Sequence, residues 1–206
     1  MIRRIGLLMA GLALAACTGA KDLDAPLVPL GNFSLGHNVV VAPKVQTTAT
    51  VSREVPKEGL IASLQSAIAE RFDRYEGTKD YHFGVSIEGY VLAKRGVPVV
   101  AAPKSAMIIR LTVWDDARGV KLNEEPEQLT VLETLDGESI VGTGWSQSAE
   151  TQLLNLSRNT AQAIENYLVK MKAEEGWFED VPGTVSLENG EASPSVIEEK
   201  LVTAAE

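Results

Sequence analysis

The stretch "AMIIRLTVW", residues 106–114, is the most strand-like run of the chain, and the fold depends on what pairs with it. Large apolar and β-branched side chains fill it without an interrupting glycine or proline. The sequence "DDARG" follows, with aspartate first and glycine last, which is typical of a tight turn. The chain is expected to return as another strand over residues 119–134, most clearly in "QLTVLET". These residues therefore predict a β-hairpin.

The strand expected before this hairpin lies in "YHFGVSIEGYVLAK", residues 81–94. Its apolar residues Phe83, Val85 and Ile87 alternate with polar ones, which is typical of a half-buried strand. Gly89 is expected to mark a β-bulge, because the alternation changes phase there.

Two amphipathic helices are predicted on either side of these strands. Pro56 and Gly77 bracket the first, since proline suits the first turn of a helix and glycine its C-terminal cap. The second is expected over residues 148–172 and is closed by Gly176. The apolar stripes, which recur every three to four residues, are Leu60, Leu64, Ile68, Phe72 and Tyr75 in the first helix and Leu153, Leu156, Thr160, Ile164, Tyr167, Leu168 and Met171 in the second.

A short β-branched run at residues 37–45 and a short strand at residues 139–143 complete the expected elements. The order β-α-β-β-β-α predicts an α+β fold with two helices packed on one face of a largely antiparallel sheet. We expect a single domain over residues 34–175, which is long enough to bury a sound core.

The N-terminus has the pattern of a signal peptide over residues 1–16. Two arginines precede a twelve-residue apolar segment, residues 5–16. A membrane-spanning helix needs about 20 apolar residues. A twelve-residue run after a basic start instead fits the apolar region of a signal peptide.

The end of this segment, Leu14-Ala15-Ala16-Cys17, resembles the lipobox of bacterial lipoproteins. The resemblance implies that Cys17 carries a diacylglyceryl group and that a signal peptidase recognises Leu14, Ala15 and Ala16 and cuts before Cys17. Two or more acyl chains anchor a protein stably to a membrane. The alternatives are a secreted protein with an unrelated cysteine, or an uncleaved start that packs as a core helix. Because Thr18 rather than aspartate follows the cysteine, the resemblance also implies the outer membrane, facing the periplasm, rather than the inner membrane.

Residues 17–33 are expected to form a tether, with its second half alternatively lying along the domain. The formal net charge of −9 argues against nucleic acid as a partner. From Lys172 to the C-terminus there are nine acids against two lysines, so residues 176–206 form an acidic, largely flexible tail. "SVIE", residues 195–198, has the form of a capping box, so a short docked helix in this tail is the alternative.

No combination of residues identifies a reaction. His37 and His82 lack metal-ligand spacing, and Asp115 and Asp116 suit a turn better than a calcium loop. The acids in "NEEPEQ", residues 123–128, are expected on a solvated strand. No nucleophile can be paired with a base, so we expect a protein that is not an enzyme and has no cofactor and no metal.

The predicted order behind a lipobox resembles several families of small bacterial envelope lipoproteins, including auxiliary lipoproteins of lipid-transport systems and lipopolysaccharide-assembly lipoproteins. "APKSAMIIRLTVWDD" and "KLNEEPEQLTVLET" are most similar to an uncharacterised lipoprotein family of alphaproteobacteria, over about residues 1–175. The resemblance implies a membrane-anchored, non-catalytic interaction or accessory protein whose partner is another envelope protein. The alternative is a module that binds a lipid or small apolar ligand between the helices and the sheet.

Overall fold

The computed structural model describes residues 23, 26–47, 52–94, 105–133 and 148–179. The predicted signal peptide, the lipobox, the short strand expected before the second helix and most of the acidic tail lie outside these residues.

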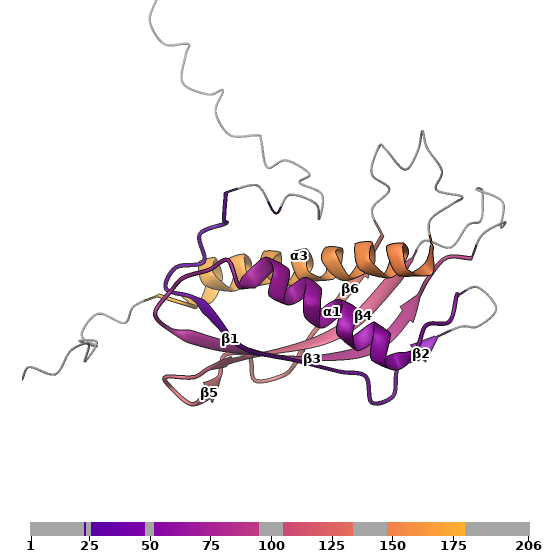
Figure 1. Ribbon diagram of the computed structural model, residues 1–206. Coiled ribbons are helices and arrows are strands. Elements are labelled where there is room, and N and C mark those ends of the chain that lie inside the picture. Colours follow the sequence, from indigo (N-terminus) through magenta and orange to yellow (C-terminus); the bar gives the residue numbers. More distant parts are fainter. Residues whose placement is uncertain (1–22, 24–25, 48–51, 95–104, 134–147, 180–206) are drawn as a thin grey trace, which may run out of the picture.

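Two helices lie on one face of a single sheet in this part of the chain (Figure 1). The strands are β1 (Ser34–Val41), β2 (Gln46–Thr47), β3 (Asp80–Val91), β4 (Ala106–Asp115), β5 (Val120–Lys121) and β6 (Glu127–Leu132), and the helices are α1 (Lys57–Phe72) and α3 (Ala149–Glu175). The predicted α+β class, with two helices on one face of the sheet, is confirmed.

The sheet is mixed but mostly antiparallel. Its strands follow the order β1-β3-β4-β5, with β2 beside β3 and β6 beside β4. The strands β1 and β2 pair with β3 in parallel, whereas β4 pairs antiparallel with β3, β5 and β6. The helix α1 connects β2 to β3, as a parallel connection requires.

The predicted hairpin forms, but its returning strand divides into β5 and β6. The side chain of Asn123 causes the interruption, because it takes the place of a backbone partner for β4. Its Oδ1 accepts a hydrogen bond from the N–H of Val113 at 2.8 Å, and its Nδ2 donates to the carbonyl of Leu111 at 2.8 Å. Pro126, which has no N–H to donate, comes just before β6.

The predicted bulge at Gly89 is confirmed by a register shift between Ile87 and Gly89 in the β3–β4 pair. The second helix has the expected caps, Ser148 and Gly176, and extends three residues beyond the predicted end at Lys172, to Glu175. Ser148 caps it by accepting a hydrogen bond from the N–H of Thr151, and Gly176 closes it with a left-handed φ of 69°.

The expected role of Gly77 as the C-terminal cap of the first helix is wrong. The helix α1 ends at Phe72, and Asp73 is its C-cap. Gly77 instead lies against the backbone of Phe33, to whose carbonyl its N–H donates a hydrogen bond at 2.9 Å. A side chain at position 77 would overlap that backbone, so glycine is needed there for close approach.

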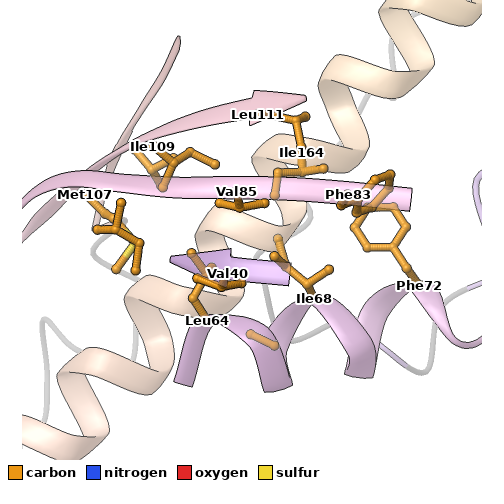
Figure 2. Packing of buried hydrophobic residues seen from close by; sticks show 14 of the residues in the cluster. Val40, Leu64, Ile68, Phe72, Phe83, Val85, Met107, Ile109, Leu111 and Ile164 are labelled. Atoms are coloured by element: carbon orange, nitrogen blue, oxygen red, sulfur yellow. The ribbon is translucent and has the colours of Figure 1, made fainter. Parts of the chain in front are cut away.

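The core lies between the helices and the sheet (Figure 2). Leu64, Ile68 and Phe72 of α1 point towards the sheet, where strands and α3 supply the opposing side chains. The largest side chains with almost no exposed surface include Phe33, Phe72, Phe83, Leu60, Leu64, Ile68, Ile87, Met107, Ile109 and Leu111. Neither described helix is both long enough and apolar enough to cross a bilayer.

Candidate functional site

The face of the sheet opposite the helices is not covered by any described element (Figure 1). Side chains alternate between the two faces of a strand, so the residues between the buried ones of β3 and β4 must lie on this uncovered side. We call this surface the open face. The strand register arranges its main rows as Val39–Gly84–Thr112, Val41–Ser86–Arg110–Gln128, Ile108–Thr130 and His82–Trp114–Lys121, with Leu132 beside Ala106 at one end.

Large apolar side chains are unusually exposed on the open face. Val39 and Val41 of β1 are 54% and 46% exposed, Trp114 of β4 is 38% exposed, and Leu132 of β6 is 55% exposed. Isolated exposed apolar residues are common on any protein, but several on one uncovered sheet face are typical of an interaction surface. These four residues come from three different strands, so only the folded sheet brings them together.

A positive charge lies in the middle of the open face. Arg110 is exposed and is flanked across the sheet by Ser86 and Gln128. Neither Arg110 nor Lys121 forms an ion pair in the part of the chain that the structure describes. Arginine and tryptophan are enriched among the residues that contribute most to protein–protein binding. The open face therefore offers an unpaired guanidinium among polar and apolar neighbours.

The two histidines meet at one end of the open face, although 45 residues separate them in the chain. Their ring centroids lie 4.7 Å apart. His82 Nδ1 accepts a hydrogen bond from the N–H of His37 at 2.8 Å, and its Nε2 lies 3.0 Å from Asp116 Oδ1. Because Nδ1 acts as an acceptor, the neutral ring carries its proton on Nε2 and donates it to Asp116. Both ring nitrogens of His82 are thus already used within the protein.

The predicted turn role of the two aspartates is confirmed. Asp115 Oδ1 accepts a hydrogen bond from the N–H of Arg118, and the carbonyl of Asp116 accepts one from Gly119, whose φ is 63°. The described residues contain no group of three or more histidine, cysteine, aspartate or glutamate side chains that could hold a metal ion.

A buried polar cluster, which the sequence did not reveal, joins α1 to α3. Arg71 Nη1 lies 2.8 Å from Glu165 Oε2, and the hydroxyl of Tyr75 donates to Glu165 Oε1 at 2.8 Å. The side chains of Arg71 and Glu165 are only 5% and 6% exposed. Burial, followed by the hydrogen bond to Glu165, raises the pKa of Tyr75 far above its ordinary value. The cluster is enclosed by the core, so it links the two helices rather than forming an accessible site.

The second half of the predicted tether lies along the domain. Leu30 and Phe33 are almost completely buried, and the ring of Phe33 lies 5.2 Å from that of Phe178, just beyond α3. The N–H of Asn32 donates to the carbonyl of Phe178 at 3.1 Å, and Lys172 Nζ donates to the carbonyl of Pro29 at 2.9 Å. The chain entering the domain and the chain leaving α3 are therefore held side by side.

The residues predicted for lipidation and cleavage, Cys17, Leu14, Ala15 and Ala16, lie outside the described residues. Their roles stay predictions. The open face and the Arg71–Glu165 cluster were both missed from the sequence. The sequence predicted two helices on one face, but it did not indicate that β1 pairs in parallel with β3, which brings Val39 and Val41 onto the same face as Arg110.

No protein-family model and no curated protein matches this chain. Several solved structures are distantly similar. A Xanthomonas campestris protein assigned to the family DUF330 matches with a TM-score of 0.39 and 9% identity, covering 74% of this chain and 94% of that one. A candidate lipoprotein from Caulobacter crescentus matches with a TM-score of 0.32 and 11% identity, covering 71% and 93%. A minor lipoprotein from Acinetobacter baumannii matches with a TM-score of 0.27 and 15% identity, covering 67% and 94%. These likenesses are too distant to carry function, which has to be argued from this chain's own residues.

Proposed function

We propose that this chain is a lipid-anchored envelope protein that binds another envelope protein through the open face, as a non-catalytic interaction or accessory protein. The observation that carries the proposal is the group of exposed apolar residues on an uncovered sheet face, with Arg110 at its centre. The lipobox sequence ending at Cys17 supports the anchor, and Thr18 supports the outer membrane, facing the periplasm, as its location.

The packing of the core favours the open face over a ligand site between the helices and the sheet. The ring centroid of Phe33 lies within 6.0 Å of those of Phe72, Tyr75, Tyr81, Phe83 and Phe178. Side chains that are almost completely buried, such as Leu64 and Ile109, fill the layer elsewhere. A lipid or other apolar ligand would have to displace this packing, whereas a protein partner needs no such change on the open face.

The non-catalytic role is supported by how the titratable groups of the described residues are used. Glu165 is bound by Arg71 and Tyr75 inside the core, and His82 uses both ring nitrogens within the protein. Neither arrangement leaves a base next to an accessible nucleophile, which general acid–base or nucleophilic catalysis requires.

The binding surface is tested by photo-crosslinking in membranes. A photoreactive amino acid replaces Val39 or Leu132 on the open face, or Lys170, whose side chain is exposed on α3 outside the open face. We expect the two open-face positions to form the same specific crosslinked product, identified by mass spectrometry, and Lys170 to form none. Equal crosslinking from all three positions, or no specific protein from the open face, would contradict the proposed surface.

The anchor is tested separately with Cys17→Ser. We expect this variant to accumulate as an unprocessed precursor or as a protein released from the membrane, because no thiol remains for lipidation. The measurement is membrane fractionation together with the intact mass of the protein. Normal processing and normal membrane recovery of the variant would rule out lipidation at Cys17.

A further inference from the structure

The open face carries a charge without a partner in the described chain. Arg110 is centred on it, and Glu88, two residues along β3 from Ser86, is not within ion-pair distance. Asp116, at the end of the face, is already engaged by His82. A guanidinium in such a position is suited to a carboxylate supplied from outside the sheet.

The sequence after the described part of the domain supplies that chemistry. Residues 180–206 contain six acids and one lysine. The adjacent acids Glu198 and Glu199 follow Ile197 directly, and Lys200 separates them from Leu201. This combination matches a face that carries an arginine and, at other positions on the same face, exposed valine, leucine and tryptophan side chains.

The place where this segment begins also fits. The described chain stops at Glu179, and the ring of the preceding residue, Phe178, lies 4.7 Å from that of Tyr81 in β3. Tyr81 is next to His82, which lies at one end of the open face. The 27 residues that follow can extend roughly 90 Å, whereas a ten-residue strand such as β4 is only about 33 Å long.

We infer that residues 180–206 dock on the open face in the free protein, with a carboxylate of Glu198 or Glu199 paired with Arg110. A segment attached to the domain has an effective concentration on the order of millimolar, so even a weak contact is populated. The inference rests on the proposed use of the open face as a binding surface. A partner protein would then have to displace the segment, and it would need a carboxylate in an apolar surrounding to replace its contacts.

The test is an intramolecular photo-crosslink in the purified, full-length, lipidated protein in detergent. A photoreactive amino acid at Val39 is expected to crosslink to residues 180–206 of the same chain. Arg110→Glu should reduce the yield of this crosslink at least about five-fold, because the new carboxylate would repel Glu198 and Glu199. Arg110→Lys keeps the positive charge and should retain most of the yield. Lys57→Glu makes the same charge change at the start of α1, away from the open face, and should leave the yield unchanged.

Two further measurements separate the contact from a loss of folding. The urea midpoint of Arg110→Glu should equal that of the parent, because Arg110 is exposed. The double variant Glu198→Gln/Glu199→Gln should lower the yield of the intrachain crosslink as much as Arg110→Glu does. It alters no residue of the described domain. Raising the salt concentration from about 0.1 M to 1 M should also lower it, because charges are screened.

Absence of an intrachain crosslink would overturn the inference, as would a yield that neither Arg110→Glu nor the glutamate changes affect. A crosslink to a second copy of the chain would overturn it too. If a partner crosslinks to the open face in membranes while the purified protein shows no such contact, the proposed function stands and only the self-docking fails. If the purified protein shows the intrachain crosslink but no partner crosslinks to the open face in membranes, the self-docking stands and the proposed function fails.

Discussion

The buried ion pair between Arg71 and Glu165 allows a quantitative test of how α1 and α3 are held together. Both side chains are enclosed by the core, and Glu165 also accepts the hydroxyl of Tyr75. Taking two charges out of water is costly, and their attraction offsets this cost only while both are present. Removing one partner should therefore be much worse than removing both.

We expect Glu165→Leu to lower the free energy of unfolding by about 3–5 kcal/mol, because it leaves the guanidinium of Arg71 buried without a counter-ion. Arg71→Met should have a cost of similar size, since the carboxylate then keeps only the hydroxyl of Tyr75. If the two effects were independent, the double variant would lose about 6–10 kcal/mol, which is most of the stability of an ordinary domain.

The double variant Arg71→Met/Glu165→Leu should instead lose only about 0–3 kcal/mol. Replacing a buried pair by apolar groups is often neutral or stabilising, and the remaining cost is the hydroxyl of Tyr75 without its acceptor, about 1–3 kcal/mol. The coupling energy of the cycle should therefore exceed about 3 kcal/mol.

A second ion pair between the same two helices provides the matched control. Arg158 Nε and Nη2 contact Glu70 Oε2 and Oε1 at 2.9 Å and 2.6 Å, but these side chains are 30% and 34% exposed. Glu70→Leu should cost no more than about 1 kcal/mol, because exposed pairs contribute little. Both pairs consist of an arginine and a glutamate, so a difference in cost between Glu165→Leu and Glu70→Leu reports the effect of burial.

The assay is equilibrium unfolding in urea, followed by circular dichroism, with the slopes of the four variants compared. Similar slopes would show that the midpoints report stability rather than a change in the unfolded state. Additive losses in the double variant, or a cost at Glu165 no larger than that at Glu70, would refute the reasoning.

Two further predictions concern close packing and pH. Gly77→Ala should lower the free energy of unfolding by about 3 kcal/mol, because the added methyl group would overlap the backbone of Phe33. The control is Gly59→Ala in α1, which has open space around it and should raise the free energy of unfolding by about 0.5–1 kcal/mol. Thermal unfolding of the two variants measures both changes. The raised pKa of Tyr75 means that its protonated form is favoured in the folded state, so its contribution is complete below about pH 10 and is lost as the pH rises through the folded pKa. Urea midpoints should fall above about pH 10, and Tyr75→Phe should reduce this slope, leaving the part due to Tyr167, whose pKa burial also raises.

Local regularities made much of the fold predictable. The stripe Leu60, Leu64, Ile68 and Phe72 has helical spacing, and all four residues are buried as expected. The bulge at Gly89 was visible because a two-residue alternation cannot change phase without an extra residue. In each case the signal and the structure involve residues close together in the chain.

What could not be predicted depends on contacts between distant segments. Gly77 has the same local appearance as a helix cap, but its role follows from the backbone of Phe33, 44 residues earlier. His37 and His82 meet because β1 and β3 pair in parallel. The two strands could be recognised separately in the sequence, but nothing in it indicated that they are neighbours in the sheet. The same parallel pairing places Val41 of β1 in one row with Ser86 and Arg110, which the sequence did not indicate either.

The two ends of the described domain limit where the open face can act. Lys172 and Asn32 hold the entering segment from Pro29 onwards against the end of α3, so the proposed anchor at Cys17 is connected to this contact by the twelve residues 17–28. Twelve residues span at most roughly 40 Å when fully extended. Phe178, where the described chain leaves α3, lies beside Tyr81 at one end of the sheet, whereas the exposed Leu132 lies at the other end and Val41 in the middle. A partner of the proposed anchored protein must therefore present its binding surface close to the bilayer, as a membrane-bound or membrane-associated envelope protein does.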